Sequence, residues 1–256
     1  MNFTAMHRQE TPLILANVWD AVSARLAEKQ GFQAIGTSSA AIAAMLGYPD
    51  GEVMPFAQYR FMVERIEHVT CLPLTVDIEA GYSRDPKNIA RHINQLAELN
   101  VVGINIEDSI MTPSRRRQLL DADQFASLLE ATQGYLSASA KQMFINVRTD
   151  VYVTQQPNAV EATIQRAQRY AQAGANGLFV PFIESLSDIE AVAKQCLLPL
   201  NVMAMPDLPD FTTLSQVGVK RISMGNRYFE AMYNDLDKRL ENMVHAQSCH
   251  NYLAQR

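Results

Sequence analysis

Acidic side chains gather at two places in the sequence, each at the end of a run of apolar residues. Asp77 and Glu79 close the run PLTVDIE, and Glu107 with Asp108 closes the run VVGINIED. Carboxylates that lie together raise one another's pKa unless a cation lies among them, and Mg²⁺ selects such oxygen ligands. We therefore expect Asp77, Glu79 and Glu107 to bind Mg²⁺ or Mn²⁺. The alternative is that each acid caps the following helix, although Glu is a poor N-cap.

Eight short runs of apolar and β-branched residues predict the strands that must position these acids. They cover residues 13–18, 33–37, 73–78, 101–106, 144–148, 177–182, 199–204 and 219–224. Segments with apolar residues every three or four positions predict helices at 20–30, 56–70, 88–100 and 161–174, with a short extra helix between 38 and 56. Strands that alternate with helices and read as continuously apolar favour a closed parallel (β/α)8 barrel over an open sheet.

In such a barrel the carboxyl ends of the strands surround the active site, so the acids of two adjacent strands meet at one mouth. If the third strand continues to Glu79, the period of two points Asp77 and Glu79 the same way. The first strand is not followed by a G-x-G-x-x-G loop, which leaves a dinucleotide site without support. The histidines do not fall at strand ends, and His92 lies within a predicted helix, so we expect no histidine-based catalysis.

The chain has 256 residues, which suits a single barrel domain over 1–256. Its net charge of −5 argues against a nucleic-acid partner. Three widely spaced cysteines argue against a disulfide framework and favour a cytoplasmic protein, and no stretch approaches the roughly 20 apolar residues of a membrane span. The residues after Gly225 predict one or two helices beyond what the barrel needs, which we interpret as an oligomerisation element.

Three motifs carry a resemblance to a known family. The stretch VDIEAGYSRDPKNIARHINQLAELNVVGINIEDS resembles the metal-binding core of the isocitrate lyase and phosphoenolpyruvate mutase superfamily. NVWDAVSARLAEKQGFQAIGTSSAAIAAMLGYPD resembles the first two units of that family and INVRTD the fifth, so the resemblance spans nearly the whole chain. It implies a barrel whose C-terminal helix is swapped between partners, a homodimer or homotetramer, and Mg²⁺-assisted formation of an enolate from a 2-oxo carboxylate.

The resemblance also implies roles for individual residues. Asp77, Glu79 and Glu107 would hold the metal and its waters. Arg148 would bind the substrate carboxylate, and the substrate would also contact Asp77 and the turn of Ser38, Ser39 and Ala40. Asp50 matches an acid near the reacting group, and Tyr82 matches a hydrogen-bond or proton donor.

Each of these roles has a structural alternative. Arg148 could form a salt bridge to Asp150 or to a barrel acid. The turn at 38–40 could be a helix N-cap, Asp50 could belong to a β-turn, and Tyr82 could be a packing residue.

The loop after Glu107-Asp108 departs from the family pattern. It reads SIMTPSRRRQLLDADQF and lacks both the Lys-Arg/Lys-Cys-Gly-His sequence of the isocitrate and methylisocitrate lyases and the Lys of the phosphonopyruvate enzymes. Its arginines, 115 to 117, either clamp a distal carboxylate or form a solvated basic loop. The pattern predicts a Mg²⁺-dependent carbon–carbon lyase or decarboxylase acting on a small 2-oxo or 2-hydroxy di- or tricarboxylate. The alternatives are a phosphonopyruvate C–P mutase or hydrolase and a non-catalytic 2-oxo acid binder.

Overall fold

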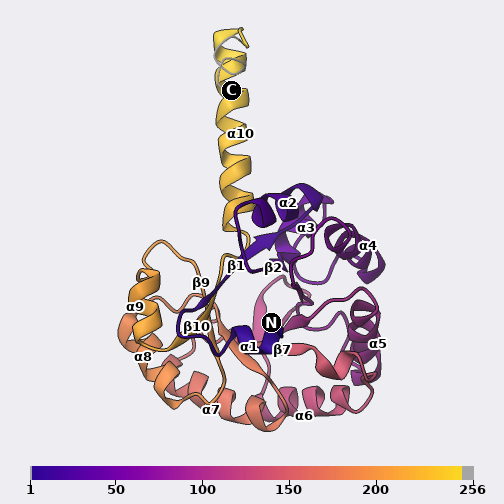
Figure 1. Ribbon diagram of the computed structural model, residues 1–256, viewed down its shortest axis with the longest axis vertical. Helices are drawn as coiled ribbons and strands as arrows, with labels where there is room; N and C mark the ends of the chain where they lie inside the picture. The colour runs from indigo at the N-terminus through magenta and orange to yellow at the C-terminus, as the bar shows by residue number, and fades with distance from the viewer. Residues whose placement is uncertain (1, 250–256) are drawn as a thin grey trace.

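The computed structural model describes residues 2–249, and eight parallel strands in it close into a barrel (Figure 1). The order around the barrel is β1-β10-β9-β8-β7-β4-β3-β2. The strands are β1 (Leu13–Val18), β2 (Ala34–Thr37), β3 (Leu74–Asp77), β4 (Gly103–Glu107), β7 (Phe144–Arg148), β8 (Gly177–Val180), β9 (Leu200–Met203) and β10 (Val219–Ser223). The predicted (β/α)8 barrel is confirmed, and each predicted strand is present.

Helices form a ring outside the barrel (Figure 1). They are α2 (Ala21–Lys29), α3 (Ser39–Met45), α4 (Phe56–Glu67), α5 (Pro86–Ala97), α6 (Ala122–Gln133), α7 (Ala159–Gln172), α8 (Leu186–Gln195) and α9 (Phe211–Gln216). Strand residues such as Val76, Ile104 and Val147 are fully buried in the apolar core. Burial of this kind on both faces of each strand explains why the strands read as continuous apolar runs.

Asp side chains cap the two helices that follow the acidic strand ends. Asp85 accepts the backbone N–H of Lys87 at the start of α5, and Asp121 accepts two backbone N–H groups at the start of α6. The capping alternative for Asp77, Glu79 and Glu107 is therefore wrong, because other residues cap both helices.

Polar residues occupy the middle of the barrel interior. The Nδ2 atom of Asn146 donates to Oδ1 of Asn105 at 2.9 Å and to Oδ1 of Asn201 at 3.1 Å. Arg221 is 1% exposed and contacts Oδ1 of Asn105 at 3.4 Å. The short helix α1 (Phe3–Met6) covers the amino-terminal end, where the ring of His7 stacks on Phe144 with centroids 4.0 Å apart.

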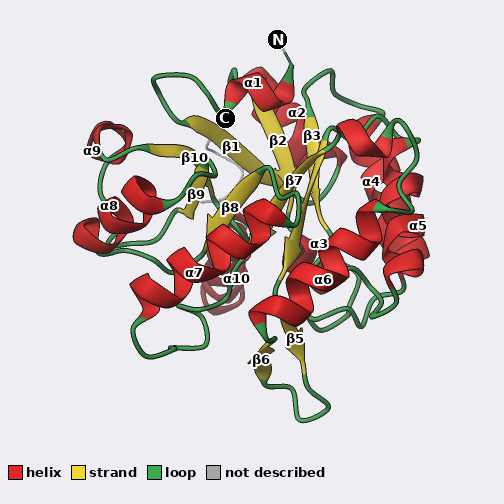
Figure 2. Ribbon diagram, turned by 90° about the horizontal axis from the view of Figure 1, so that it is seen from below, coloured by secondary structure: helices red, strands yellow, loops and turns green. Residues whose placement is uncertain are grey.

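Three further elements lie outside the ring. Strands β5 (Ser109–Met111) and β6 (Arg117–Leu119) form an antiparallel hairpin at the end of the barrel opposite α1 (Figure 2). The 3-10 turn η1 (Ala140–Gln142) precedes β7, and α10 (Arg227–Ala246) projects away from the barrel without burying any residue (Figure 1). Over the part of the chain that the structure describes, no helix is both long and apolar enough to cross a membrane.

Candidate active site

A pocket of about 320 Å³ lies at the carboxyl ends of the strands. Its walls come from the loops after the strands, from the β5–β6 hairpin and from the start of α10. The predicted site residues that line it are Ser38, Ser39, Ala40, Asp50, Asp77, Glu79, Glu107 and Arg148. The structure thus brings together residues from β2, β3, β4 and β7 that are up to 110 positions apart in the sequence.

Asp77 is the last residue of β3, and its backbone is held on both sides. Its N–H donates to Oγ1 of Thr37 at 3.0 Å, and its carbonyl accepts the hydroxyl of Tyr59 at 2.6 Å. In the side chain, Oδ2 accepts the hydroxyl of Ser39 at 3.0 Å and Oδ1 accepts the N–H of Glu79 at 3.2 Å. Burial raises the pKa of Asp77 above its ordinary value, although Arg148 opposes this.

Glu79 lies beyond the end of β3 in a left-handed conformation, with φ of 50°. The premise that β3 continues to Glu79 is wrong, because the strand ends at Asp77. Glu79 nevertheless enters the pocket because its carbonyl accepts the N–H of Glu107 at 2.8 Å, which joins the turn to β4. Its Oε2 atom is buried without a hydrogen-bond partner. Burial, and then the charges of Asp50 and Asp77, raise the pKa of Glu79 to about 9.

Glu107 ends β4 between two guanidinium groups. Its Oε1 atom accepts a short hydrogen bond from Arg117, and its Oε2 atom lies 3.1 Å from Nη1 of Arg148. Asp150 completes the network, because its Oδ1 pairs with Nε of Arg148 at 2.6 Å and its Oδ2 with Nη1 of Arg117 at 3.0 Å. Burial raises the pKa of Glu107 to about 7 against the opposing charge of Arg148.

The turn after β2 forms the opposite wall. Ser38 is the N-cap of α3 and accepts the N–H of Ala41 at 3.3 Å, so the capping alternative holds there. The first N–H groups of a helix have no acceptor within it, which leaves those of Ser39 and Ala40 available at the pocket wall. Asp50 is in a turn before Gly51, as its alternative stated, and its side chain also lines the pocket.

Comparison with known proteins places this chain in a family. The family model described as phosphoenolpyruvate phosphomutase matches residues 3–244. The chain belongs to the phosphoenolpyruvate mutase and isocitrate lyase superfamily. An uncharacterised protein of Mycobacterium tuberculosis is 33% identical over 231 residues, which cover 90% of this chain and 84% of that one.

Two further relatives carry functional names. Oxaloacetate decarboxylase 1 of Pseudomonas fluorescens is 28% identical over 237 residues, covering 90% of this chain and 80% of the enzyme. The crystal structure of a putative phosphonomutase from Burkholderia cenocepacia superposes with a TM-score of 0.85 at 38% identity, covering 93% of this chain and 97% of that one. The resemblance inferred from the three motifs is confirmed, and the chain is an enzyme of this superfamily.

The carboxylates fit a hard cation in chemistry, but they are not arranged as a closed cage. In residues 2–249, no three His, Cys, Asp or Glu side chains converge on one point that could hold a metal ion. The donor set is nevertheless the oxygen set that Mg²⁺ prefers, and the unpartnered Oε2 of Glu79 is a buried acceptor that a cation would satisfy. Glu107 is turned toward Arg117 and Arg148 instead. Asp77 and Glu79 thus fit a metal as they stand, and Glu107 fits once one guanidinium withdraws.

Tyr82 lies beside this pocket rather than on its wall. Its ring packs against Phe56 and Tyr59, with centroids 5.4 and 5.8 Å away. Its hydroxyl donates to Oε1 of Glu79 at 3.4 Å. In this arrangement Tyr82 reaches the site only through Glu79, and the ring contacts fit the packing alternative.

Sequence reasoning placed Arg117 with Arg115 and Arg116 as either a carboxylate clamp or a solvated loop, and it did not predict the contact of Arg117 with Glu107 or the burial of Asp108 away from the pocket. Arg115 and Arg116 are exposed, as a solvated loop predicts, whereas Arg117 enters the pocket. Asp108 is fully buried on the other side of β4, where its Oδ2 accepts the hydroxyl of Tyr170 at 2.6 Å. The alternation of side chains along a strand was the signal that separates Glu107 from Asp108. The hairpin that delivers Arg117 gave no such signal.

Proposed function

We propose that the chain is a Mg²⁺-dependent carbon–carbon lyase or decarboxylase that acts on a small 2-oxo or 2-hydroxy di- or tricarboxylate through an enolate. The observation that carries this proposal is the pairing of carboxylates and guanidinium groups across one small pocket. Asp77 and Glu79 lie on one side of it and Arg148 on another. Carboxylates recruit a cation, and guanidinium groups recruit an anionic substrate.

The size and charge of the pocket favour a small polyanion. A volume of about 320 Å³ is near the lower limit for ligand sites, which suits an acid of a few carbons. Arg117 and Arg227 line the pocket in addition to Arg148, so a second carboxylate on the substrate would meet a cation. The hairpin that bears Arg117 contains neither Lys nor Cys between residues 109 and 119, which disfavours C–P chemistry of the kind that uses a loop Lys.

Different side chains of the pocket would contact the substrate and the metal. Arg148 has five N–H donors, and its contacts with Glu107 and Asp150 engage three of them, which leaves donors for a substrate carboxylate. Ser39 orients Asp77 through its hydroxyl, and the first amides of α3 face the same pocket. Bound Mg²⁺ would supply positive charge beside the oxygen that becomes the enolate.

A substrate panel tests this function. Oxaloacetate, 2-alkylmalates, methylisocitrate and phosphonopyruvate are incubated with enzyme and Mg²⁺, and the products are followed by proton and phosphorus NMR. Release of pyruvate or another 2-oxo acid from a di- or tricarboxylate supports the proposal. Phosphate or phosphoenolpyruvate formed from phosphonopyruvate would establish the C–P activity instead, and oxalate binding without any turnover would indicate a binder.

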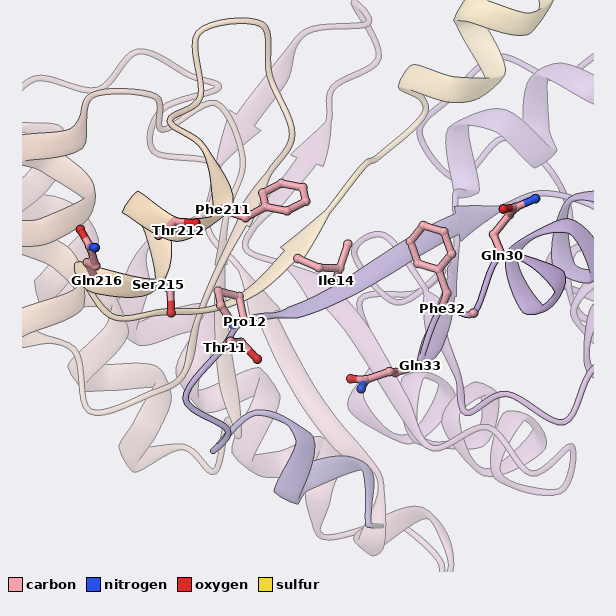
Figure 3. A pocket seen from close by; sticks show the side chains of 11 residues that line it. Thr11, Pro12, Ile14, Gln30, Phe32, Gln33, Phe211, Thr212, Ser215 and Gln216 are labelled. Atoms are coloured by element: carbon pink, nitrogen blue, oxygen red, sulfur yellow. The ribbon is translucent and has the colours of Figure 1, made fainter.

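We also propose that two copies assemble by exchanging α10. In a (β/α)8 barrel the helix after the last strand covers the wall between the first and last strands, but here α10 projects away and leaves that place open. A pocket of about 650 Å³ lies there, and Ile14, Phe32 and Phe211 line it between β1 and α9 (Figure 3). The helix carries an apolar stripe with a spacing of four residues that includes Met232, Leu236 and Leu240, each between 44% and 48% exposed. A stripe of this kind needs a partner surface, and the open place on a second copy offers one.

Light scattering coupled to gel filtration tests the exchange. The wild type is expected to elute as a dimer or tetramer, and the double variant Leu236→Glu/Leu240→Glu as a monomer. Lys238→Glu, which also introduces a Glu but about half a turn from Leu236, should leave the assembly intact. A monomeric wild type, or a double variant that assembles normally, would count against the exchange.

A further inference from the structure

Arg117 is the cation at the mouth of the pocket with the largest number of acidic partners. Its Nη1 atom contacts Oε1 of Glu107, Oγ of Ser109 at 2.9 Å and Oδ2 of Asp150 at 3.0 Å. Its Nη2 atom lies 3.7 Å from Oδ2 of Asp50. The side chain is 17% exposed, so these contacts are largely shielded from water.

These contacts engage the oxygen of Glu107 that faces away from Arg148. Oε2 of Glu107 pairs with Arg148, and Oε1 would keep only the hydroxyl of Ser109, at 3.4 Å, if Arg117 left. Asp150 would stay neutralised after that departure, because Arg148 holds both of its oxygens, at 2.6 and 3.2 Å. Asp50 would lose little stabilisation when its ion pair with Arg117 breaks, because its side chain is 46% exposed to water. The network can therefore release Arg117 without leaving Asp150 as a buried unpaired charge.

The hairpin that carries Arg117 is anchored to the barrel mouth at its base and exposed at its tip. Strands β5 and β6 are each three residues long, and residues 113–116 between them are exposed. On the pocket side, besides Arg117, the buried hydroxyl of Ser109 donates to Oδ2 of Asp150 at 2.5 Å, and Nη2 of Arg115 donates to the carbonyl of Asp50 at 2.9 Å. A short hairpin with an exposed tip can open at a fraction of the global unfolding free energy.

We propose that Arg117 competes with the metal ion for Glu107. The guanidinium contacts Oε1 of Glu107, and a divalent cation held by the carboxylates would displace it and so loosen the β5–β6 hairpin. The inference rests on the proposed function, because it requires the metal site. It makes Arg117 a positioning residue that couples metal occupancy to the state of the hairpin.

Competition predicts a gain of metal affinity when Arg117 is removed. Mg²⁺ is titrated into wild type, Arg117→Met and Arg116→Met by calorimetry without substrate. Arg117→Met should bind Mg²⁺ about tenfold more tightly, since a factor of ten corresponds to about the strength of one charge-assisted hydrogen bond. Arg116→Met, which removes the same charge from an exposed neighbour, should bind as the wild type does. Arg117→Lys is a second variant, which keeps the positive charge but loses the guanidinium that contacts several acceptors at once. It should also bind Mg²⁺ more tightly than the wild type.

Trypsin cleavage after Arg115 and Arg116 supplies a readout of the hairpin itself. Mg²⁺ should accelerate cleavage of the wild type, whereas Arg117→Met should be cleaved rapidly with or without Mg²⁺. Equal or weaker Mg²⁺ binding by Arg117→Met, or cleavage of the wild type that ignores Mg²⁺, overturns the competition and leaves the metal site standing. Failure of all the proteins to bind Mg²⁺ removes the metal site and the competition together.

Discussion

Replacing Asp108 with Asn should destabilise the protein by about 3 kcal/mol, the scale for breaking a buried ion pair from one side. Asp108 is fully buried and accepts four hydrogen bonds. Its Oδ1 accepts the N–H of Asp150 at 2.9 Å, and its Oδ2 accepts Thr149 at 2.7 Å, Tyr170 at 2.6 Å and Nη1 of Arg166 at 3.0 Å. An Asn that keeps the first bond turns an NH₂ group toward three donors, and it also leaves the guanidinium without its counter-charge.

Urea unfolding followed by circular dichroism measures this loss, and calorimetry should show a melting temperature lower by about 8 °C for a chain of this size. The matched control is Asp123→Asn, which breaks an ion pair of 2.5 Å to Arg169 in which both side chains are exposed. The control should change stability by less than about 0.5 kcal/mol. If Asp108→Asn lowered the unfolding free energy by less than about 1 kcal/mol, or by no more than the control does, the reasoning about burial would be refuted.

Two buried titratable groups make properties of the protein depend on pH. Burial raises the pKa of Glu79 to about 9, and a metal needs the carboxylate, so Mg²⁺ affinity should rise by up to about tenfold per pH unit between pH 6 and 8. Calorimetric titrations at pH 6, 7 and 8 check this, and a flat profile contradicts it. Burial and the charge of Arg221 lower the pKa of His7 to about 3. Below pH 6.5, His7 is therefore protonated in the unfolded chain but stays neutral in the folded chain. Unfolding free energy should therefore fall by about 2 kcal/mol more between pH 7 and 5 in the wild type than in His7→Gln, and equal losses in urea would count against it.

The barrel was predictable because its strands are buried on both faces. Runs such as LILANV and FINVR have a composition that a half-exposed strand does not show, and β1 and β7 match these runs residue for residue. The acids at the ends of β3 and β4 were visible for the same reason, since they interrupt apolar runs at the point where a barrel strand meets its active site.

The electrostatic environment of the site could not be predicted in this way. Glu79 adopts a left-handed conformation that no propensity favours. The alternation argument assumed an extended strand there, so it placed Glu79 in the pocket although the assumed backbone conformation was wrong. Arg117 reaches Glu107 through a hairpin with three-residue strands, which are too short to leave a periodic pattern. Arg221 lies in the barrel interior, where sequence rules expect an apolar side chain. Each of these positions depends on contacts between distant segments.

We propose above all that Asp77, Glu79 and Glu107 hold a divalent cation, which in turn binds a 2-oxo acid. Oxalate, which has the shape and charge of a pyruvate enolate, tests it most directly when titrated by calorimetry with Mg²⁺ and again with EDTA. The wild type should bind oxalate only when Mg²⁺ is present. Glu79→Gln should lose this binding, and the exposed control Glu64→Gln should keep it. Oxalate binding that persists in EDTA, or that survives in Glu79→Gln, would contradict the claim.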